Sequence, residues 1–229
     1  IGRSFEGFLG KDSFLSGELL LMHLFINETM SESHDDHDDV VIDGVYWTKT
    51  IPSLEENSVY DVYFLNFRNM DFLGSGNSLA SYNNIGLRFN GQKDNFVLES
   101  EWTLQTSSGT SSNNDVSANL FSFNLGYKPD GIGFLNSVFI GLDRISGDDS
   151  STEIAEGFSK EFGARHKHHG FYDYNLHKKY FGHGHDGLNE INAKASIDIL
   201  KRTNLLVALH NFRSAVNDIY YGHEMNFIF

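Results

Sequence analysis

The chain has 229 residues, a formal net charge of −14 and no cysteine. The acidic charge argues against nucleic acid as a partner, and the lack of cysteine excludes disulfides and thiolate chemistry. The longest apolar run, 19–26, is broken by His23 and falls far short of the roughly 18 residues of a membrane helix.

From its first residues onward the chain reads as a succession of strands, with almost no helix signal. The 22 glycines, the 14% of aromatic residues and the mere 2 prolines fit many strands and few breakers. The predicted strands lie at 3–10, 14–26, 39–51, 58–68, 79–91, 95–106, 115–128, 136–147, 187–201, 203–213 and 218–229.

Several of these strands alternate cleanly between apolar and polar positions. In 95–106, Phe96 and Trp102 share one side, while Glu99 and Glu101 share the other. A soluble β-sandwich gives the same period of two, with its apolar side in the core. The alternation therefore predicts an all-β fold without choosing between a soluble and a membrane protein.

The connections between the strands alternate in length, with the short connection 214–217 as the exception. Up-and-down membrane barrels show this asymmetry, because they have short periplasmic turns and long external loops. The short or moderate connections are 11–13, 52–57, 91–94, 129–135 and 201–202, and the long ones are 27–38, 69–78, 107–114 and 148–186.

The last strand also has the length and composition of a membrane strand. It ends on Phe229, and an aromatic C-terminal residue resembles the closing strand of a bacterial outer-membrane barrel. One side is predicted to hold Ile219, Tyr221, Met225, Phe227 and Phe229, and the other Tyr220, Gly222, Glu224 and Asn226. We expect an antiparallel up-and-down transmembrane β-barrel that forms one domain over 1–229, with a long extracellular or lumen-folded loop at 148–186. Eleven strands is an odd number, whereas single-chain bacterial barrels have even counts. Either the count is wrong by one, or the N-terminal part of the wall lies outside this chain.

Four short motifs resemble the alginate-export family of outer-membrane β-barrels. They are Arg3–Gly7, Ser146–Asp148, His166–Asp173 and Gly187–Glu190, and they occur in the order that the family has. The resemblance implies a barrel of about 18 strands, of which this chain is the C-terminal portion. It also implies passive export or diffusion through a pore whose basic residues attract polyuronate. Here the candidate pore charges are mostly acidic.

A pore acts through the side chains that line it, so the polar sides of the strands supply the candidate site. The alternative is simple solvation of the polar side of each strand. For two further candidates, Asp43 and Asp61, a register step of one residue would reverse the face. The pore-lining candidates are Glu18, Arg88, Glu99, Glu101, Asp143, Lys194, Asp198, His210 and Glu224.

The long loop supplies a second set of candidates, which we expect to fold into the pore as a constriction. This set consists of Arg165, His166, His168, His169, Asp173 and Glu190. His34 and His37 lie in an acidic run and are weak metal candidates, but an acidic external loop is the better interpretation. We predict no metal and no cofactor.

The predicted function is that of a bacterial outer-membrane porin or exporter for a polar or charged solute, such as an oligo- or polysaccharide. The alternative is a structural barrel that anchors an envelope assembly and has a loop-plugged pore. An enzyme with a site in the lumen and a soluble binding protein are weaker rivals, and we predict no enzymatic activity. The expected partners are outer-membrane lipid or lipopolysaccharide, the solute and other envelope proteins.

Overall fold

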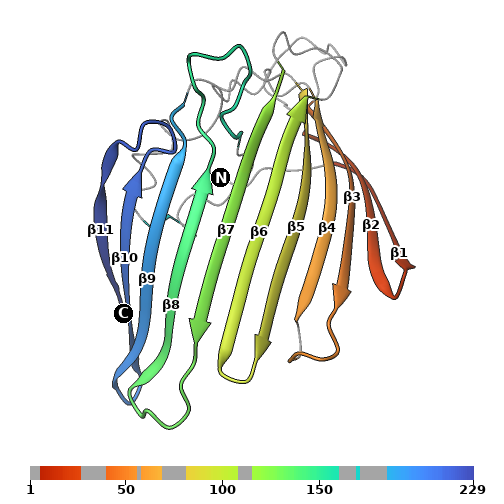
Figure 1. The fold of residues 1–229 in the computed structure, drawn as a ribbon. Coiled ribbons are helices and arrows are strands. Elements are labelled where there is room, and N and C mark those ends of the chain that lie inside the picture. Colours follow the sequence, from red (N-terminus) through yellow and green to blue (C-terminus); the bar gives the residue numbers. More distant parts are fainter. Residues whose placement is uncertain are drawn as a thin grey trace, which may run out of the picture.

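The computed structural model describes residues 6–26, 40–55, 58–68, 81–107, 115–159, 169–170 and 185–229. Eleven antiparallel strands form one sheet, in which every strand pairs with its neighbours in the sequence (Figure 1). The all-β fold and all eleven predicted strands are confirmed. The strands are β1 (Glu6–Phe14), β2 (Gly17–Ile26), β3 (Val40–Thr50), β4 (Val59–Arg68), β5 (Ser81–Lys93), β6 (Phe96–Ser107), β7 (Ser117–Tyr127), β8 (Leu135–Ile145), β9 (Leu188–Leu200), β10 (Thr203–Arg213) and β11 (Tyr220–Ile228).

The described part of the chain contains no helix that is long and apolar enough to span a bilayer.

The sheet has a turn edge and a loop edge, because consecutive antiparallel strands place their connections alternately at opposite ends. The odd-numbered strands run from the loop edge to the turn edge, where the chain ends (Figure 1). The predicted sorting of short and long connections is confirmed. The turn edge carries the connections 15–16, 51–58, 94–95, 128–134 and 201–202, and the strands joined through 27–39, 69–80, 108–116, 146–187 and 214–219 meet at the loop edge.

The first hairpin turn lies further along the chain than predicted. Residues 11–13 belong to β1, and the turn is formed by Leu15 and Ser16, whose φ angles are 48° and 60°. Two consecutive positive φ angles are typical of a type I′ turn, whose twist matches that of the flanking strands. The polar residues at 11–13 indicated a turn, but Lys11 is a strand residue that forms an ion pair with Glu18 across the hairpin.

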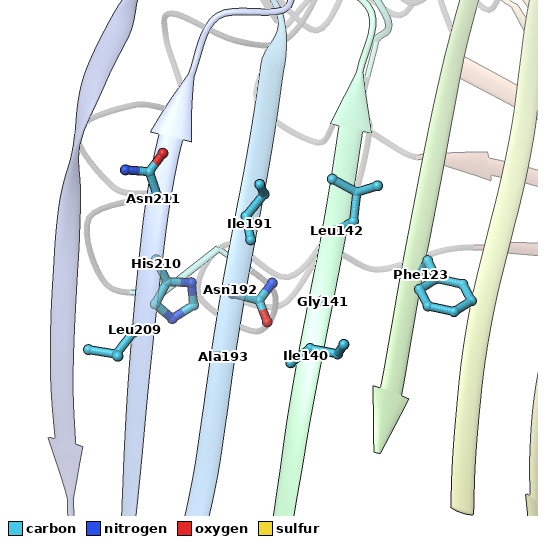
Figure 2. Close-up of a pocket in the computed structure, with 10 residues that line it drawn as sticks. All are labelled: Phe123, Ile140, Gly141, Leu142, Ile191, Asn192, Ala193, Leu209, His210 and Asn211. Carbon is cyan, nitrogen blue, oxygen red and sulfur yellow. The ribbon is translucent and has the colours of Figure 1, made fainter. Parts of the chain in front are cut away.

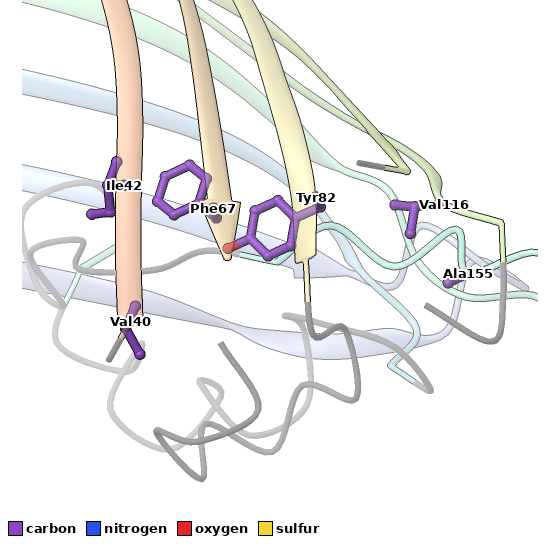
Figure 3. Close-up of a cluster of buried hydrophobic side chains, with 6 residues drawn as sticks. All are labelled: Val40, Ile42, Phe67, Tyr82, Val116 and Ala155. Atoms are coloured by element: carbon purple, nitrogen blue, oxygen red, sulfur yellow. The ribbon is translucent and has the colours of Figure 1, made fainter. Parts of the chain in front are cut away.

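The two faces of the sheet differ, and we call the face that is covered by residues 146–159 the inner face. Near the loop edge, this segment packs on two apolar clusters of the inner face. Figure 3 shows the first cluster, in which Ala155 and Val116 join Val40, Ile42, Phe67 and Tyr82. In the second, Phe158 packs with Ala118, Ile145, Leu188 and Phe212.

The opposite, outer face is apolar and exposed. Five residues from β2 to β6 are successive register partners and form one apolar row: Leu21, Val45, Phe64, Ile85 and Leu104. Further along the sheet, Ile140 and Met225 are 55% and 57% exposed. Between β7 and β10, mainly apolar side chains of this face, including Leu142, Ile191 and Leu209, line a hollow of about 630 Å³ (Figure 2).

Polar rows border the apolar outer face on the side of the loop edge. A continuous row of register partners runs from β2 to β7 through His23, Asp43, Asn66, Asn83, Thr106 and Ser117. On β8, β9 and β10 the corresponding partners are Arg144, Asn189 and Arg213. From β4 to β7 the apolar part of the outer face therefore ends along this row, whereas on β2 and β3 Phe25 and Val41 lie beyond it.

Aromatic side chains gather on the outer face near the turn edge. Trp47 and Tyr60 make an edge-to-face contact with ring centroids 5.3 Å apart, and Phe96 and Tyr127 lie 5.1 Å apart. The indole nitrogen of Trp47 donates a hydrogen bond of 2.8 Å to the carbonyl oxygen of Phe14. This edge therefore combines apolar rings with polar groups.

In β11, the predicted positions of Tyr220 and Tyr221 are wrong. The register with β10 shifts between Phe212 and Arg213, so Tyr220 pairs with Arg213 on the outer face. Tyr221 packs against the second inner cluster instead. Beyond the shift the predicted alternation holds, because Glu224 pairs with His210 on the inner face and Met225 lies on the outer face.

Candidate functional site

The register places all nine predicted pore-lining residues on the inner face. They come from β2, β5, β6, β8, β9, β10 and β11, so they are spread across most of the sheet. Near the turn edge, Glu18 forms an ion pair of 2.6 Å with Lys11. Asp198 accepts hydrogen bonds from the amides of Asn136 and Asn204. Glu99 is exposed and Lys194 is half-buried.

A first polar cluster joins β4, β5 and β6. Arg88 donates to Asp61 at 2.9 Å, and the Asp61 side chain is almost fully buried. The Tyr63 hydroxyl donates to Glu101 at 2.6 Å and lies 2.6 Å from the hydroxyl of Thr103. Two of the predicted residues, Arg88 and Glu101, are thus held in fixed positions by neighbours on the inner face.

A glycine makes room for this cluster. A Cβ on Gly86 would lie 2.0 Å from the ring of Tyr63, so the tyrosine can lie across β5 only because position 86 has no side chain. Tyr46 stacks on the other side of the Tyr63 ring, with centroids 5.4 Å apart. The orientation of Tyr63, and with it the hydrogen bond to Glu101, is set by packing.

A second polar cluster is centred on Glu190, which is 0% exposed. Its carboxylate lies 2.6 Å from Nδ1 of His169 and 2.7 Å from Nδ1 of His210, and it accepts a hydrogen bond of 3.2 Å from the amide of Asn192. Asp143, the register partner of Glu190, lies 4.0 Å from Nδ1 of His169. This cluster brings together Asp143 and His210 of the predicted pore-lining set with His169 and Glu190 of the predicted constriction set.

His169 belongs to the long connection between β8 and β9, and its contact with Glu190 places this part of the connection on the inner face. The next residue, Gly170, has a φ of 70° and lies against Glu224, whose carboxylate oxygens are 2.9 Å from the position of a Cβ on the glycine. Residues 169–170 therefore lie across β8 to β11.

One acidic residue that was expected on the polar side lies on the opposite face. Asp43 is on the outer face, where it forms ion pairs with His23 and Arg68. Its expected position is wrong because the alternation in β3 is set by Val40 and Ile42, which are buried on the inner face. Asp61, which was ambiguous in the same way, lies on the inner face.

Several predicted residues fall outside the part of the chain that the structure describes. These are Arg165, His166, His168 and Asp173 of the loop set, and the weak metal candidates His34 and His37.

The sequence reading missed three members of the two polar clusters. Tyr63, Thr103 and Asn192 occupy positions that the alternation assigns to the polar side of their strands. They carry no charge, whereas the predicted pore-lining residues are all charged residues or histidines. The burial of Phe158 could not be predicted from the sequence, because an isolated Phe in a long loop is not part of a periodic pattern.

No protein-family model matches the chain, and no curated protein sequence matches it. Function is therefore inferred from the geometry of the two faces. The inner face offers fixed charges and hydrogen-bonding groups, and the outer face offers a large apolar surface.

Proposed function

We propose that the chain forms the wall of an outer-membrane β-barrel that gives passive passage to a polar or charged solute. The observation that carries the proposal is the exposed apolar outer face, which extends over the sheet and ends at a polar boundary. Soluble monomeric proteins rarely expose contiguous apolar patches of more than a few hundred Å². Contact with lipid removes this surface from water.

The dimensions of the strands support a membrane location. The strand β7 has 11 residues. At about 3.3 Å per residue and a tilt of about 40°, such a strand spans roughly 28 Å, close to the apolar belt of about 25 Å in outer-membrane barrels. Aromatic residues at the turn edge, such as Trp47 and Tyr60, match the aromatic girdle that these barrels place at the membrane surface.

The charges of the inner face support a preference for cations or for neutral polar solutes. Among the described strand residues, the acidic ones on this face are Glu18, Asp61, Glu99, Glu101, Asp143, Glu190, Asp198 and Glu224, and the basic ones are Lys11, Arg88 and Lys194. Rings of carboxylates select cations in pores. An acidic polysaccharide is therefore disfavoured, although the motifs resemble those of the alginate-export family.

Conductance in planar bilayers tests the proposal. The full chain, refolded in detergent and reconstituted, should give discrete channels that prefer K⁺ over Cl⁻. Replacing Glu99 and Glu101 by Gln should lower this preference, because it removes two inner-face charges. Replacing Glu6 by Gln is the matched control, since Glu6 lies on the outer face of β1 and its loss should leave the selectivity unchanged.

A second candidate function is that of a structural barrel with a closed pore. Two contacts favour it: Phe158 is buried on the inner face, and His169 is bound to Glu190. In this case the protein would insert into bilayers and give no channels. Insertion without conductance would therefore support the structural role over the pore.

A further inference from the structure

The structure assigns a binding site for a divalent transition-metal ion to Asp143, His169 and Glu190 on the inner face. One ligand atom of each residue lies within 4.8 Å of the other two. The proposal does not rest on passage of a solute, because it concerns the buried contact between the loop and the wall.

The donor atoms are the right kind for such an ion. One imidazole nitrogen and two carboxylate groups are typical ligands of Zn²⁺ and of neighbouring first-row metals. Ligand atoms on one ion are separated by about 3–4 Å, because each lies roughly 2.0–2.2 Å from the metal. The separation of Asp143 and His169 is 4.0 Å, and that of His169 and Glu190 is 2.6 Å. An ion between them requires shifts of less than about 1 Å.

The electrostatics of the cluster favour a cation. Asp143 and Glu190 are register partners and are 6% and 0% exposed, so two carboxylates lie side by side with little solvent. Adjacent buried carboxylates are unfavourable unless positive charge compensates them. A divalent ion supplies two positive charges at the point where both carboxylates meet His169.

Neighbouring residues orient the proposed ligands. His210 and Asn192 both contact the Glu190 oxygen Oε1, which leaves Oε2 directed at His169. Groups that hold a metal-binding carboxylate in this way strengthen metal affinity. His210 is 4% exposed and Asn192 is 2% exposed, so these supporting residues are themselves buried.

An independent observation points to a ligand in this region. The Asn192 side-chain oxygen is buried and has no hydrogen-bond partner among the residues that the structure describes. Such a group is rare, because a buried polar atom without a partner loses its hydrogen bonds to water and gains none in return. The position of a Cβ on Gly141 lies 2.5 Å from this oxygen and from the side-chain oxygen of Asn124. The side chains of Asn124 and Asn192 thus meet over Gly141 on the inner face, and a water bound to a metal ion would give the Asn192 oxygen a hydrogen-bond donor.

Zinc titration of the full chain in detergent micelles tests the site. His34 and His37 are replaced by Ala in all samples, so that the acidic loop contributes no background. Calorimetry should show one Zn²⁺ bound per chain. Glu190→Gln and Asp143→Asn keep the shape of each side chain and should each lower the affinity at least ~10-fold. At one zinc concentration, Zn²⁺ should raise the melting temperature of the parent more than that of Glu190→Gln.

The matched control is His223→Ala, which removes a histidine from the outer face of β11 and should retain full affinity. Absence of zinc binding in the parent would overturn the proposal. So would equal affinity in the parent, Glu190→Gln and Asp143→Asn, because the cluster would then be a hydrogen-bonded network alone. Channel formation is measured separately, so failure of the metal site leaves the pore untouched, and the reverse also holds.

Discussion

The substitution Ile140→Arg tests whether the outer face contacts lipid or water. Ile140 is the sixth residue of β8, Leu135–Ile145, and its side chain is 55% exposed. At about 3.3 Å per residue and a tilt of about 40°, it lies roughly 13 Å from either end of the strand. That distance places it near the middle of an apolar belt that is about 25 Å tall.

The expected cost depends on what surrounds the side chain. Arg at the bilayer midplane of a β-barrel costs about 2–4 kcal/mol, and near the interface about 0–1 kcal/mol. On a protein surface in water, a substitution at such an exposed site changes the stability by about 0.5 kcal/mol or less. Thr106→Arg is the matched control, because Thr106 belongs to the polar row of the outer face that borders the apolar surface.

The free energy of unfolding is measured by guanidinium titration of protein folded into phospholipid vesicles. Ile140→Arg should lower it by about 2–4 kcal/mol, and Thr106→Arg by about 1 kcal/mol or less. The reasoning is refuted if both variants cost the same. It is also refuted if the parent protein is folded and monodisperse in water without detergent, since its outer face would then not need lipid.

Two further substitutions test the inner face. Gly86→Ala should destabilise the sheet by about 1–3 kcal/mol, because the new Cβ would lie 2.0 Å from the ring of Tyr63. The control is Gly133→Ala, where nothing lies within 4 Å of the new Cβ, and it should change the midpoint of guanidinium unfolding very little. Equal shifts of the midpoint in the two variants would contradict the packing argument. Phe158→Ala should lower the free energy of unfolding by about 3–5 kcal/mol, because it removes a buried side chain. It should also release residues 146–159 from the inner face and raise the single-channel conductance. The control is Ile154→Ala, at a side chain that is 40% exposed, which should leave the conductance unchanged.

The strands could be predicted because their signal is local. Several strands alternate between a polar and an apolar side, as Glu99 and Glu101 do with Phe96 and Trp102, and the alternating lengths of the connections favour an up-and-down order. The errors arose where one local pattern is compatible with two structures. The polar residues at 11–13 look like a turn, yet Lys11 faces Glu18 across a hairpin.

The candidate site could be predicted only in part, since its parts come from distant elements. Asp143, His169, Glu190 and His210 stood out as charged residues or histidines, and Asn192 did not. Nothing local indicates that His169 contacts Glu190 and lies near Asp143. A bulge such as the one beside Arg213 also interrupts the alternation, and Tyr220 and Tyr221 therefore lie on the faces opposite to those predicted. The apolar clusters of the inner face, such as that of Phe158, could not be predicted either, because their members are far apart in the sequence.

The direction of the two edge strands limits how this sheet can be completed into a tube. β1 and β11 both run from the loop edge to the turn edge, and each has a single strand partner among the described residues. Joined directly, they would form a parallel seam in an otherwise antiparallel wall. An antiparallel seam on both sides requires an odd number of intervening strands, the first and last of them running opposite to both edges. A segment or partner that closed this sheet through antiparallel seams alone would have to obey this parity.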